Sequence, residues 1–459
     1  MLDLTTGKEW KKILLFVFPM LIGNVFQQMY NIVDSIIVGN FIGKEALASV
    51  GAAFPVTFVF ISLVIGVSVG SGAIISQYYG AKNYEKVKAS VDTMFVFLFL
   101  SSIVITAIGL IFSEQIYKML GLPNELLPQA TEYLNITLFG MITVFGFNGV
   151  SAALRGVGDS KTPLYFLIIA TFLNIVLDLL FVIVFKFGVA GVAWATVIAQ
   201  TVTFLISIVY LNRTNEYVKF SLLKINFDKQ IFFDSIKISI PSGLQHTFVA
   251  LGMMALFSIV NKFGTSVIAA YTIAGRINTF VTLPAMTFSA ALSTFTGQNL
   301  GANKIERIRR GYLSTWLMTS ILSVSMTILL IIFREEIMRV FINNEEVIKI
   351  GANYIVIVSC FYLIFSTMFI TNGLFRGAGA TLIPMFITIF SLWIVQIPLS
   401  YFLSTLYGVN GIWWGIPSAW IIGMILSFMY YLYGNWKKNV VVKHINDDNI
   451  FSAVNTPVN

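Results

Sequence analysis

The chain has 459 residues, of which 57% are apolar and only 11% are charged. A soluble globular domain carries roughly 25% charged residues, so this composition excludes an ordinary soluble protein and indicates an integral membrane protein. The formal net charge of +8 is expected to come from basic loops on one side of the membrane rather than from a nucleic-acid-binding surface. The single cysteine, Cys360, excludes an intrachain disulfide framework and a cysteine-rich metal cluster.

Twelve segments are long and apolar enough to cross the ~30 Å hydrocarbon core of a membrane. The first six cover residues 12–38, 52–77, 90–112, 129–154, 163–185 and 189–211, and the second six cover 233–260, 268–296, 312–333, 348–374, 383–406 and 412–434. We therefore predict an all-α integral membrane protein with twelve transmembrane helices in two six-helix bundles. Residues 1–211 form the first bundle (N-lobe), 212–232 a linker, 233–435 the second bundle (C-lobe), and 436–459 a polar tail.

The two halves carry the same sequence motifs, 221 positions apart. The first motif is Gln77, Gly80, Ala81 and Glu85, which recur as Gln298, Gly301, Ala302 and Glu306; the second is Arg155, Gly156, Gly158 and Pro163, which recur as Arg376, Gly377, Gly379 and Pro384. Each half has an even number of spans, so both halves enter the membrane from the same side. An internal repeat of this kind predicts two similar bundles, related by an axis along the membrane normal, with a binding site between them.

The basic residues predict the orientation of the chain. Of the 29 lysines and arginines, Arg276 lies inside the eighth span, and only seven fall in the loops on one side: Lys44, Lys118, Lys186, Lys262, Arg334, Arg339 and Lys349. Loops that face the cytoplasm carry the excess of basic residues. We therefore expect a multi-pass protein of the bacterial plasma membrane with both termini and the linker in the cytoplasm.

The motifs of common enzymes are missing from the sequence. It contains no GxxxxGK[ST] phosphate loop, no HExxH and no GxSxG, and it has only two histidines. A chain without these motifs lacks the usual means of hydrolysing ATP, peptides or esters. We expect a protein that is not an enzyme and uses no cofactor, and whose work is driven by an ion gradient.

Two acidic residues lie at membrane depth, where an ionised group is costly unless it is neutralised, paired or hydrated. Asp34 lies 15 residues beyond Pro19, and Asp178 lies 15 residues beyond Pro163, in spans that run in the same direction. At 1.5 Å per residue, both carboxyl groups lie about 22 Å outward of these prolines and can share one depth. Their i,i+4 neighbours Tyr30 and Asn174 face the same way as the acids.

A pocket with two carboxyl groups can load a proton, or hold Na⁺ with oxygen ligands from Asp34, Asp178 and Asn174. The alternative is that the acids only hydrogen-bond helices together, or that Asp34 lies at the hydrated end of its span. The second half has no matching acid, since the corresponding positions are Ala255 and Pro398. Ion coupling is therefore expected in the N-lobe alone.

Other polar residues inside the spans are candidates for the wall of a substrate cavity. These are Gln27, Gln245, Arg276 and Asn278. Interhelical hydrogen bonding is the alternative role for each of them.

Several motifs taken together resemble the multidrug and toxic compound extrusion (MATE) transporters. They are PxxxGNxxQxxYNxVDSxxVG around Asp34, GxxxGSGAxISQYYGA, ALRGVGDSKTP and NIVLD, and the resemblance runs from about Lys8 to Lys438. It implies two six-helix bundles arranged as a V, and export of amphipathic, usually cationic drugs and dyes by antiport of H⁺ or Na⁺. It also implies that a proton or cation site is formed by Asp34, Tyr30, Asn174, Asp178 and Thr196. Pro19 would mark a bend of the first span that is associated with coupling.

The resemblance also indicates a branch of the family. NorM-like members use a glutamate in the seventh helix and an aspartate in the tenth, and the corresponding spans of this chain contain neither. This favours the DinF-like or MepA-like branch, with coupling through the N-lobe, and a monomer is sufficient because the two halves are fused. Two alternatives remain: a flippase or exporter for a lipid-linked or metabolite substrate, and a membrane scaffold or receptor that transports nothing.

Overall fold

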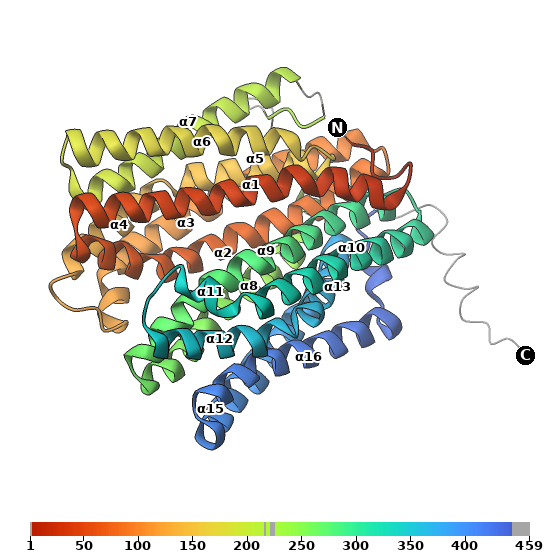
Figure 1. Ribbon diagram of the computed structural model, residues 1–459. Coiled ribbons are helices and arrows are strands. Elements are labelled where there is room, and N and C mark those ends of the chain that lie inside the picture. Colours follow the sequence, from red (N-terminus) through yellow and green to blue (C-terminus); the bar gives the residue numbers. More distant parts are fainter. Residues whose placement is uncertain (1, 215–216, 221–224, 443–459) are drawn as a thin grey trace, which may run out of the picture.

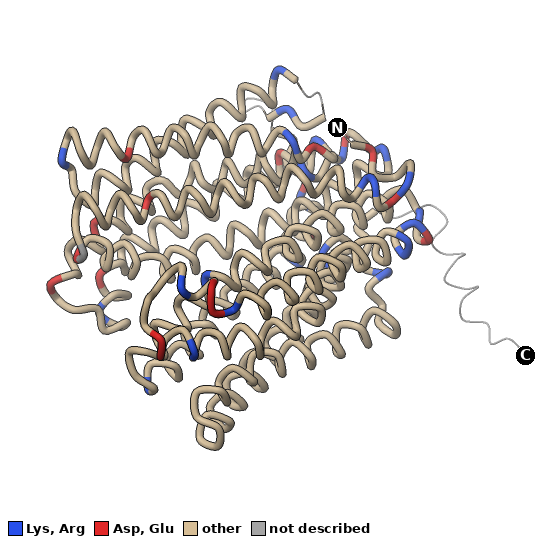
Figure 2. Tube along the Cα trace, in the orientation of Figure 1, with Lys and Arg blue, Asp and Glu red and all other residues tan. Residues whose placement is uncertain are grey.

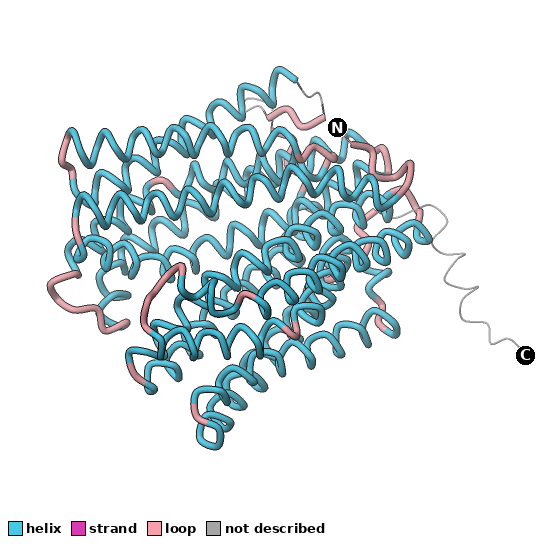
Figure 3. The backbone as a smooth tube through the Cα atoms, in the orientation of Figure 1, coloured by secondary structure: helices cyan, strands magenta, loops and turns pink. Residues whose placement is uncertain are grey.

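The computed structural model describes residues 2–214, 217–220 and 225–442. Within these ranges every regular element is a helix (Figure 3), so the predicted all-α fold is confirmed. Residues 215–216 and 221–224 of the predicted linker, and the predicted tail from residue 443 onward, lie outside the described residues.

The N-lobe contains six spans, two of which end in a π-helical turn and one of which is bent. They are α1 (Glu9–Ile37) with η1 (Val38–Ile42), α2 (Lys44–Gly80), α3 (Tyr84–Met119), α4 (Leu127–Phe139) with α5 (Met141–Gly156), α6 (Lys161–Leu179) with η2 (Leu180–Val184), and α7 (Gly188–Thr214). The fourth span bends by 48° between α4 and α5.

The C-lobe repeats this plan. Its spans are α8 (Lys229–Val260) with η3 (Asn261–Phe263), α9 (Thr265–Gly301), α10 (Ile305–Ile332), α12 (Glu345–Ser359) with α13 (Tyr362–Ala378), α14 (Leu382–Ile389) with η4 (Phe390–Gln396) and α15 (Ile397–Tyr407), and α16 (Val409–Tyr433), while α11 (Arg334–Arg339) and η5 (Trp436–Asn439) are short. The fourth span is again bent, by 51°, and the fifth again contains a π-helical stretch. Both lobes therefore deviate from a straight helix at corresponding places, as a duplication predicts.

Among the described residues, nine helices are long and apolar enough to cross a membrane, and the two bent pairs raise the number to eleven. The twelfth span is α9, which has 37 residues and carries Arg276 and Asn278. Many helices exceed the predicted spans: α2 also has 37 residues, which corresponds to about 55 Å. Such helices extend beyond the hydrocarbon core, because a helix satisfies its own backbone hydrogen bonds on either side of the membrane boundary.

The helices of each lobe run roughly parallel, and the start of α1 and the end of α16 lie at the same end of the bundle (Figure 1). We call this end the terminal face and the opposite end the distal face. Lysines and arginines gather at the terminal face (Figure 2), as the loop composition predicts.

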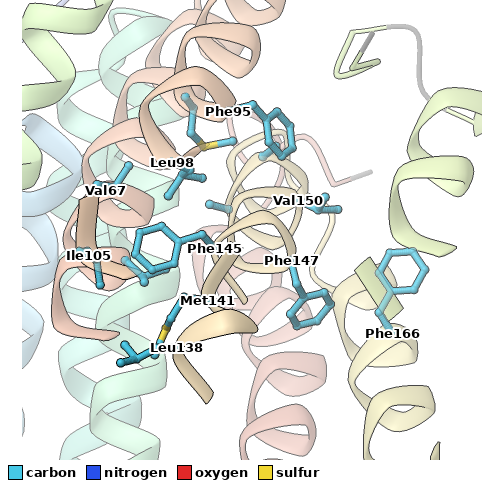
Figure 4. Packing of buried hydrophobic residues seen from close by; sticks show 14 of the residues in the cluster. Val67, Phe95, Leu98, Ile105, Leu138, Met141, Phe145, Phe147, Val150 and Phe166 are labelled. Carbon is cyan, nitrogen blue, oxygen red and sulfur yellow. The ribbon is translucent and has the colours of Figure 1, made fainter. Parts of the chain in front are cut away.

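The core of the N-lobe is formed by aromatic and aliphatic side chains of α3 and α5. Phe95 and Leu98 pack with Met141, Phe145 and Val150 (Figure 4). In lipid, helices associate through close packing rather than through the hydrophobic effect. A Cβ at Gly149 would lie 2.6 Å from Leu98, so this glycine allows α5 to approach α3.

The lobes meet along α2, which packs against α8 and α9 of the C-lobe. A Cβ at Gly66 would lie 2.5 Å from the backbone nitrogen of Gly243. Gly66 and Gly70 thus form the small-xxx-small surface that close helix crossing requires. The first half of α1 also crosses to the C-lobe, where Phe16 and Val17 are buried against C-lobe side chains such as Phe288.

Candidate ion and proton site

Asp34 and Asp178 lie next to each other between α1 and α6, close enough for their carboxyl groups to interact. Asp178 is fully buried, and neither of its oxygens has a hydrogen-bond partner among the described residues; the same holds for one oxygen of Asp34. Each acid lies within four residues of the π-helical turn that ends its span. Such turns are frequent at functional sites because they change the direction of the side chains that follow.

Three further side chains complete the site from α1, α6 and α7. The hydroxyl groups of Tyr30 and Thr196 are hydrogen-bonded at 3.0 Å. The amide nitrogen of Asn174 donates to the hydroxyl oxygen of Thr196 at 3.3 Å, while the amide oxygen of Asn174 is buried without a partner among the described residues. The structure therefore brings together all five residues that the sequence predicts: Asp34, Asp178, Asn174, Tyr30 and Thr196.

A cavity of about 20 Å³ lies beside these residues, and Gln27, Tyr30, Asn174 and Thr196 line part of it. A cavity of roughly 10–15 Å³ is large enough for one water molecule. Gln200 of α7 also lines it, with a side-chain oxygen that lacks a partner among the described residues. The cavity thus has the size and the polar wall to hold water or a small ion.

Tyr133 of α4 is a further neighbour of the site that no sequence motif indicates, as its phenol interacts electrostatically with Asp34, Asp178 and Tyr30. The fourth span has no acid to draw attention to it, and tyrosine is common in this chain, with 18 copies. Only the fold shows that this one faces the acids.

The other predicted site residues are spread over both lobes. Gln27 lines the N-lobe cavity. The amide nitrogen of Gln245 donates to the Thr388 hydroxyl at 2.6 Å, and the amide oxygen of Asn278 accepts from the Tyr362 hydroxyl at 2.9 Å. Both bonds join helices within the C-lobe, which is the alternative role considered for these residues.

Arg276 is exposed and makes no hydrogen bond or ion pair with the described part of the chain. Pro19 is buried inside α1, which continues through it as one helix from Glu9 to Ile37. The bend at Pro19 stays a prediction.

Two further arginines lie just past the ends of the predicted fourth and tenth spans. Arg155 and Arg376 belong to the last turns of α5 and α13. Arg376 donates to the hydroxyl of Ser289 at 2.7 Å. These arginines are thus part of the helix bundles.

Burial and mutual repulsion restrict the charge that the two carboxyl groups can carry together. Two ionised carboxylates side by side, of which Asp178 is fully buried, are strongly unfavourable, because each loses hydration and repels the other. A proton held by the pair, or a cation bound by the carboxyl oxygens and the free amide oxygen of Asn174, would relieve this repulsion. Oxygen atoms of this kind suit hard cations.

The MatE family profile matches residues 19–180 and again 241–402. The chain belongs to the MatE family. The profile matches once in each half, which agrees with the internal repeat.

The relatives match this chain over nearly their whole length. The chain is 33% identical to the probable multidrug resistance protein YoeA of Bacillus subtilis, over 95% of this chain and 96% of the relative. It is 23% identical to an FAD transporter of Shewanella oneidensis, over 87% and 89% of the two chains. A solved outward-facing multidrug resistance transporter of the MATE family superposes with a TM-score of 0.88 at 25% identity, covering 96% of this chain and 99% of that one. The protein is therefore a MATE-type membrane transporter with the family's twelve-helix fold.

Proposed function

We propose that the protein exports amphipathic, often cationic drugs and dyes by alternating access, driven by the inflow of H⁺ or Na⁺ through the Asp34–Asp178 site. The terminal face lies in the cytoplasm, and a single copy of the chain carries out the cycle. The observation that carries the proposal is the acid pair at membrane depth, in which Asp178 is fully buried and three of the four carboxyl oxygens have no partner among the described residues. A membrane protein that only scaffolds or signals does not need such a costly pair.

In this cycle, ions enter the N-lobe from outside and change the charge of the pair. A proton or Na⁺ neutralises the carboxylates, the helices around them repack, and the bound drug is released outward. Loss of the ion toward the cytoplasm restores the charged pair and resets the lobe. Each elementary charge that moves across a potential of 100 mV contributes about 2.3 kcal/mol, so the ratio of ions to drug charges determines how much the membrane potential assists export.

The test is efflux of ethidium from proteoliposomes with an imposed pH gradient or, separately, an imposed Na⁺ gradient. We expect Asp34→Asn and Asp178→Asn to abolish gradient-driven efflux while the purified protein stays folded. Glu132→Gln is the matched control, because Glu132 is an exposed acid of the same lobe, and it should retain efflux. Normal efflux by either aspartate variant would refute coupling through this site.

Export of a metabolite is the second candidate, and the similarity to an FAD transporter favours it over a lipid-linked substrate. Proteoliposomes loaded with FAD instead of ethidium distinguish the two. Gradient-driven loss of FAD with no loss of ethidium would replace the drug by a flavin nucleotide as substrate, and would leave the role of the acid pair unchanged.

A further inference from the structure

The duplicated motifs meet each other across the interface between the lobes. The amide nitrogen of Gln77 on α2 donates to the carbonyl oxygen of Gly377 at 3.0 Å. The amide nitrogen of Gln298 on α9 donates to the carbonyl oxygen of Gly156 at 2.9 Å. Gln77 and Gln298 are repeat-related, and so are Gly156 and Gly377. The first motif of each lobe therefore binds the second motif of the other lobe.

The two glycine carbonyls lie at helix ends. Gly156 is the last residue of α5, and Gly377 is in the last turn of α13. The last carbonyls of a helix have no partner within it, so each glutamine satisfies a helix end of the opposite lobe. Both glutamine side chains are fully buried.

The remaining polar atom of each glutamine also binds a segment at the terminal face. The side-chain oxygen of Gln298 accepts from the backbone N–H of Leu4 at 3.2 Å. That of Gln77 accepts from the backbone N–H of Val441 at 2.8 Å. Leu4 belongs to the segment before α1, and Val441 to the segment after α16. The segment before α1 therefore covers Gln298, and the segment after α16 covers Gln77.

A second layer of repeat-related contacts lies outside the glutamines. Arg307 of α10 is 3.1 Å from Glu9 of α1, and its guanidinium also donates to the backbone carbonyls of Leu4, Gly7 and Thr6. Lys86, the N-lobe residue 221 positions before Arg307, is 2.6 Å from Asp228, which caps the start of α8. Each basic residue therefore holds the segment that leads into the first helix of the other lobe.

We propose that these contacts form a two-layer gate that closes the terminal face. The hydrogen bonds of Gln77 and Gln298 form its inner layer, and the ion pairs Arg307–Glu9 and Lys86–Asp228 form its outer layer. This inference rests on the proposed alternating-access cycle, because it assigns the residues that must separate when the cavity opens to that face. Separation leaves two amides and two glycine carbonyls without partners. Water has to enter to hydrogen-bond to them, so opening and hydration of the gate occur together.

Distances between spin labels across the terminal face test the gate. Both labels are attached to cysteines introduced by Lys161→Cys on α6 and Arg310→Cys on α10, in a Cys360→Ser background. The side chains of Lys161 and Arg310 are exposed and take no part in the contacts above. We expect the wild type to give mainly the short distance of the closed face.

Gln77→Glu and Gln298→Glu keep the shape of each side chain but replace the amide donor by a carboxylate oxygen facing a carbonyl oxygen. Each should raise the population with long distances about tenfold at neutral pH, since an unpaired buried charge is costlier than a lost neutral hydrogen bond. Lowering the pH should reverse the change, because a protonated glutamate can donate to the glycine carbonyl again. The repeat predicts similar effects for the two variants.

Gln245→Glu is the matched control, because Gln245 is also buried but bonds only within the C-lobe. It should leave the distances unchanged. If both gate variants gave the wild-type distances, or if Gln245→Glu opened the face equally, the gate would be wrong. If a glutamate variant does not fold, Glu9→Gln tests the outer layer without altering the buried pair, and unchanged distances there would remove that layer from the proposal.

The same preparations separate this inference from the proposed function. If the wild type shows no gradient-driven efflux but the glutamate variants open the terminal face, the gate would be retained and the antiport overturned. Normal coupled efflux by the wild type with no response of the distances to Gln77→Glu and Gln298→Glu would retain the antiport and overturn the gate.

Discussion

Adding one methyl group at Gly80 should shift the protein toward a state that is open at the terminal face. Here α2 crosses α9 so closely that a Cβ at Gly80 would lie 1.9 Å from the carbonyl oxygen of Gln298. A carbon and a carbonyl oxygen normally stay about 3.3 Å apart, so the backbones must separate by roughly 1.4 Å. Overpacking of this kind costs about 1–3 kcal/mol, and no flexible side chain can move aside to reduce it.

Because the strain exists only when the lobes are closed at this face, it acts on the equilibrium between closed and open states. A cost of about 2 kcal/mol changes that equilibrium about 30-fold. The spin-label pair at positions 161 and 310 measures it as a gain of long distances. Gly301→Ala should act in the same way, since its Cβ would lie 1.8 Å from the carbonyl oxygen of Gln77.

The controls are glycines on the same two helices whose Cβ would meet nothing within 4 Å, namely Gly51 on α2 and Gly275 on α9. Gly51→Ala and Gly275→Ala change helix propensity equally but leave the crossing untouched. If Gly80→Ala kept the closed distances, or if all four variants opened the face alike, the close crossing would not be what holds the lobes together at this end.

Two other predictions concern the outer layer and the ion site. The hydrogen bond from Lys86 lowers the pKa of Asp228 below its usual 3.8. Because the pKa of Asp228 is lowered, its contact with Lys86 is stabilised at every pH above 3.8, and this stabilisation is lost only as the pH falls through the lowered pKa. Asp228→Asn should therefore open the face to the same extent from about pH 5 to pH 8. A strong pH dependence of the opening in that window would refute this role. Thr196→Val removes the hydroxyl group to which both Tyr30 and Asn174 are hydrogen-bonded, and should raise the ion concentration needed for half-maximal efflux about tenfold, roughly the effect of one lost buried hydrogen bond. An unchanged ion dependence of efflux would exclude Thr196 from the site.

Local sequence signals were sufficient for the spans and for the acid pair. The length of an apolar run can be compared with the thickness of a membrane, and an acidic residue within such a run is easily recognised. Asp34 and Asp178 could therefore be found without a structure. The bend of the C-lobe's fourth span could not, because it falls beside Phe361, whose residue type does not indicate a helix break. Tertiary packing determines such a break.

Sequence was also insufficient to distinguish polar residues that line a cavity from those that bond to another helix. Gln27 and Gln245 look alike in their spans, yet Gln27 lines the N-lobe cavity and Gln245 bonds to Thr388. The partner lies 143 residues away, and no local pattern identifies it. The duplicated glutamines illustrate the same limit, since their repetition was visible but their role at the interface was not.

The duplication has been retained at the gate and lost at the ion site. The gate is symmetric, with Gln77 and Gln298 in equivalent contacts, whereas the C-lobe has Ala255 and Pro398 where the N-lobe has its acids. In the proposed cycle, the free energy of ion binding therefore enters one lobe and has to reach a gate that belongs to both. Helix α1 connects the two directly, because it carries Asp34 and, near its terminal end, Phe16 and Glu9, which contact the C-lobe.

Pro19 lies on α1 between these contacts and Asp34. A proline inside a helix removes one backbone hydrogen bond and lowers the resistance of the helix to bending at that point. A change of charge at Asp34 can then tilt the distal part of α1 without pulling Phe16 from the C-lobe at once. In this structure α1 is continuous through Pro19, so a bend at this proline is what the proposed cycle requires of a second conformation.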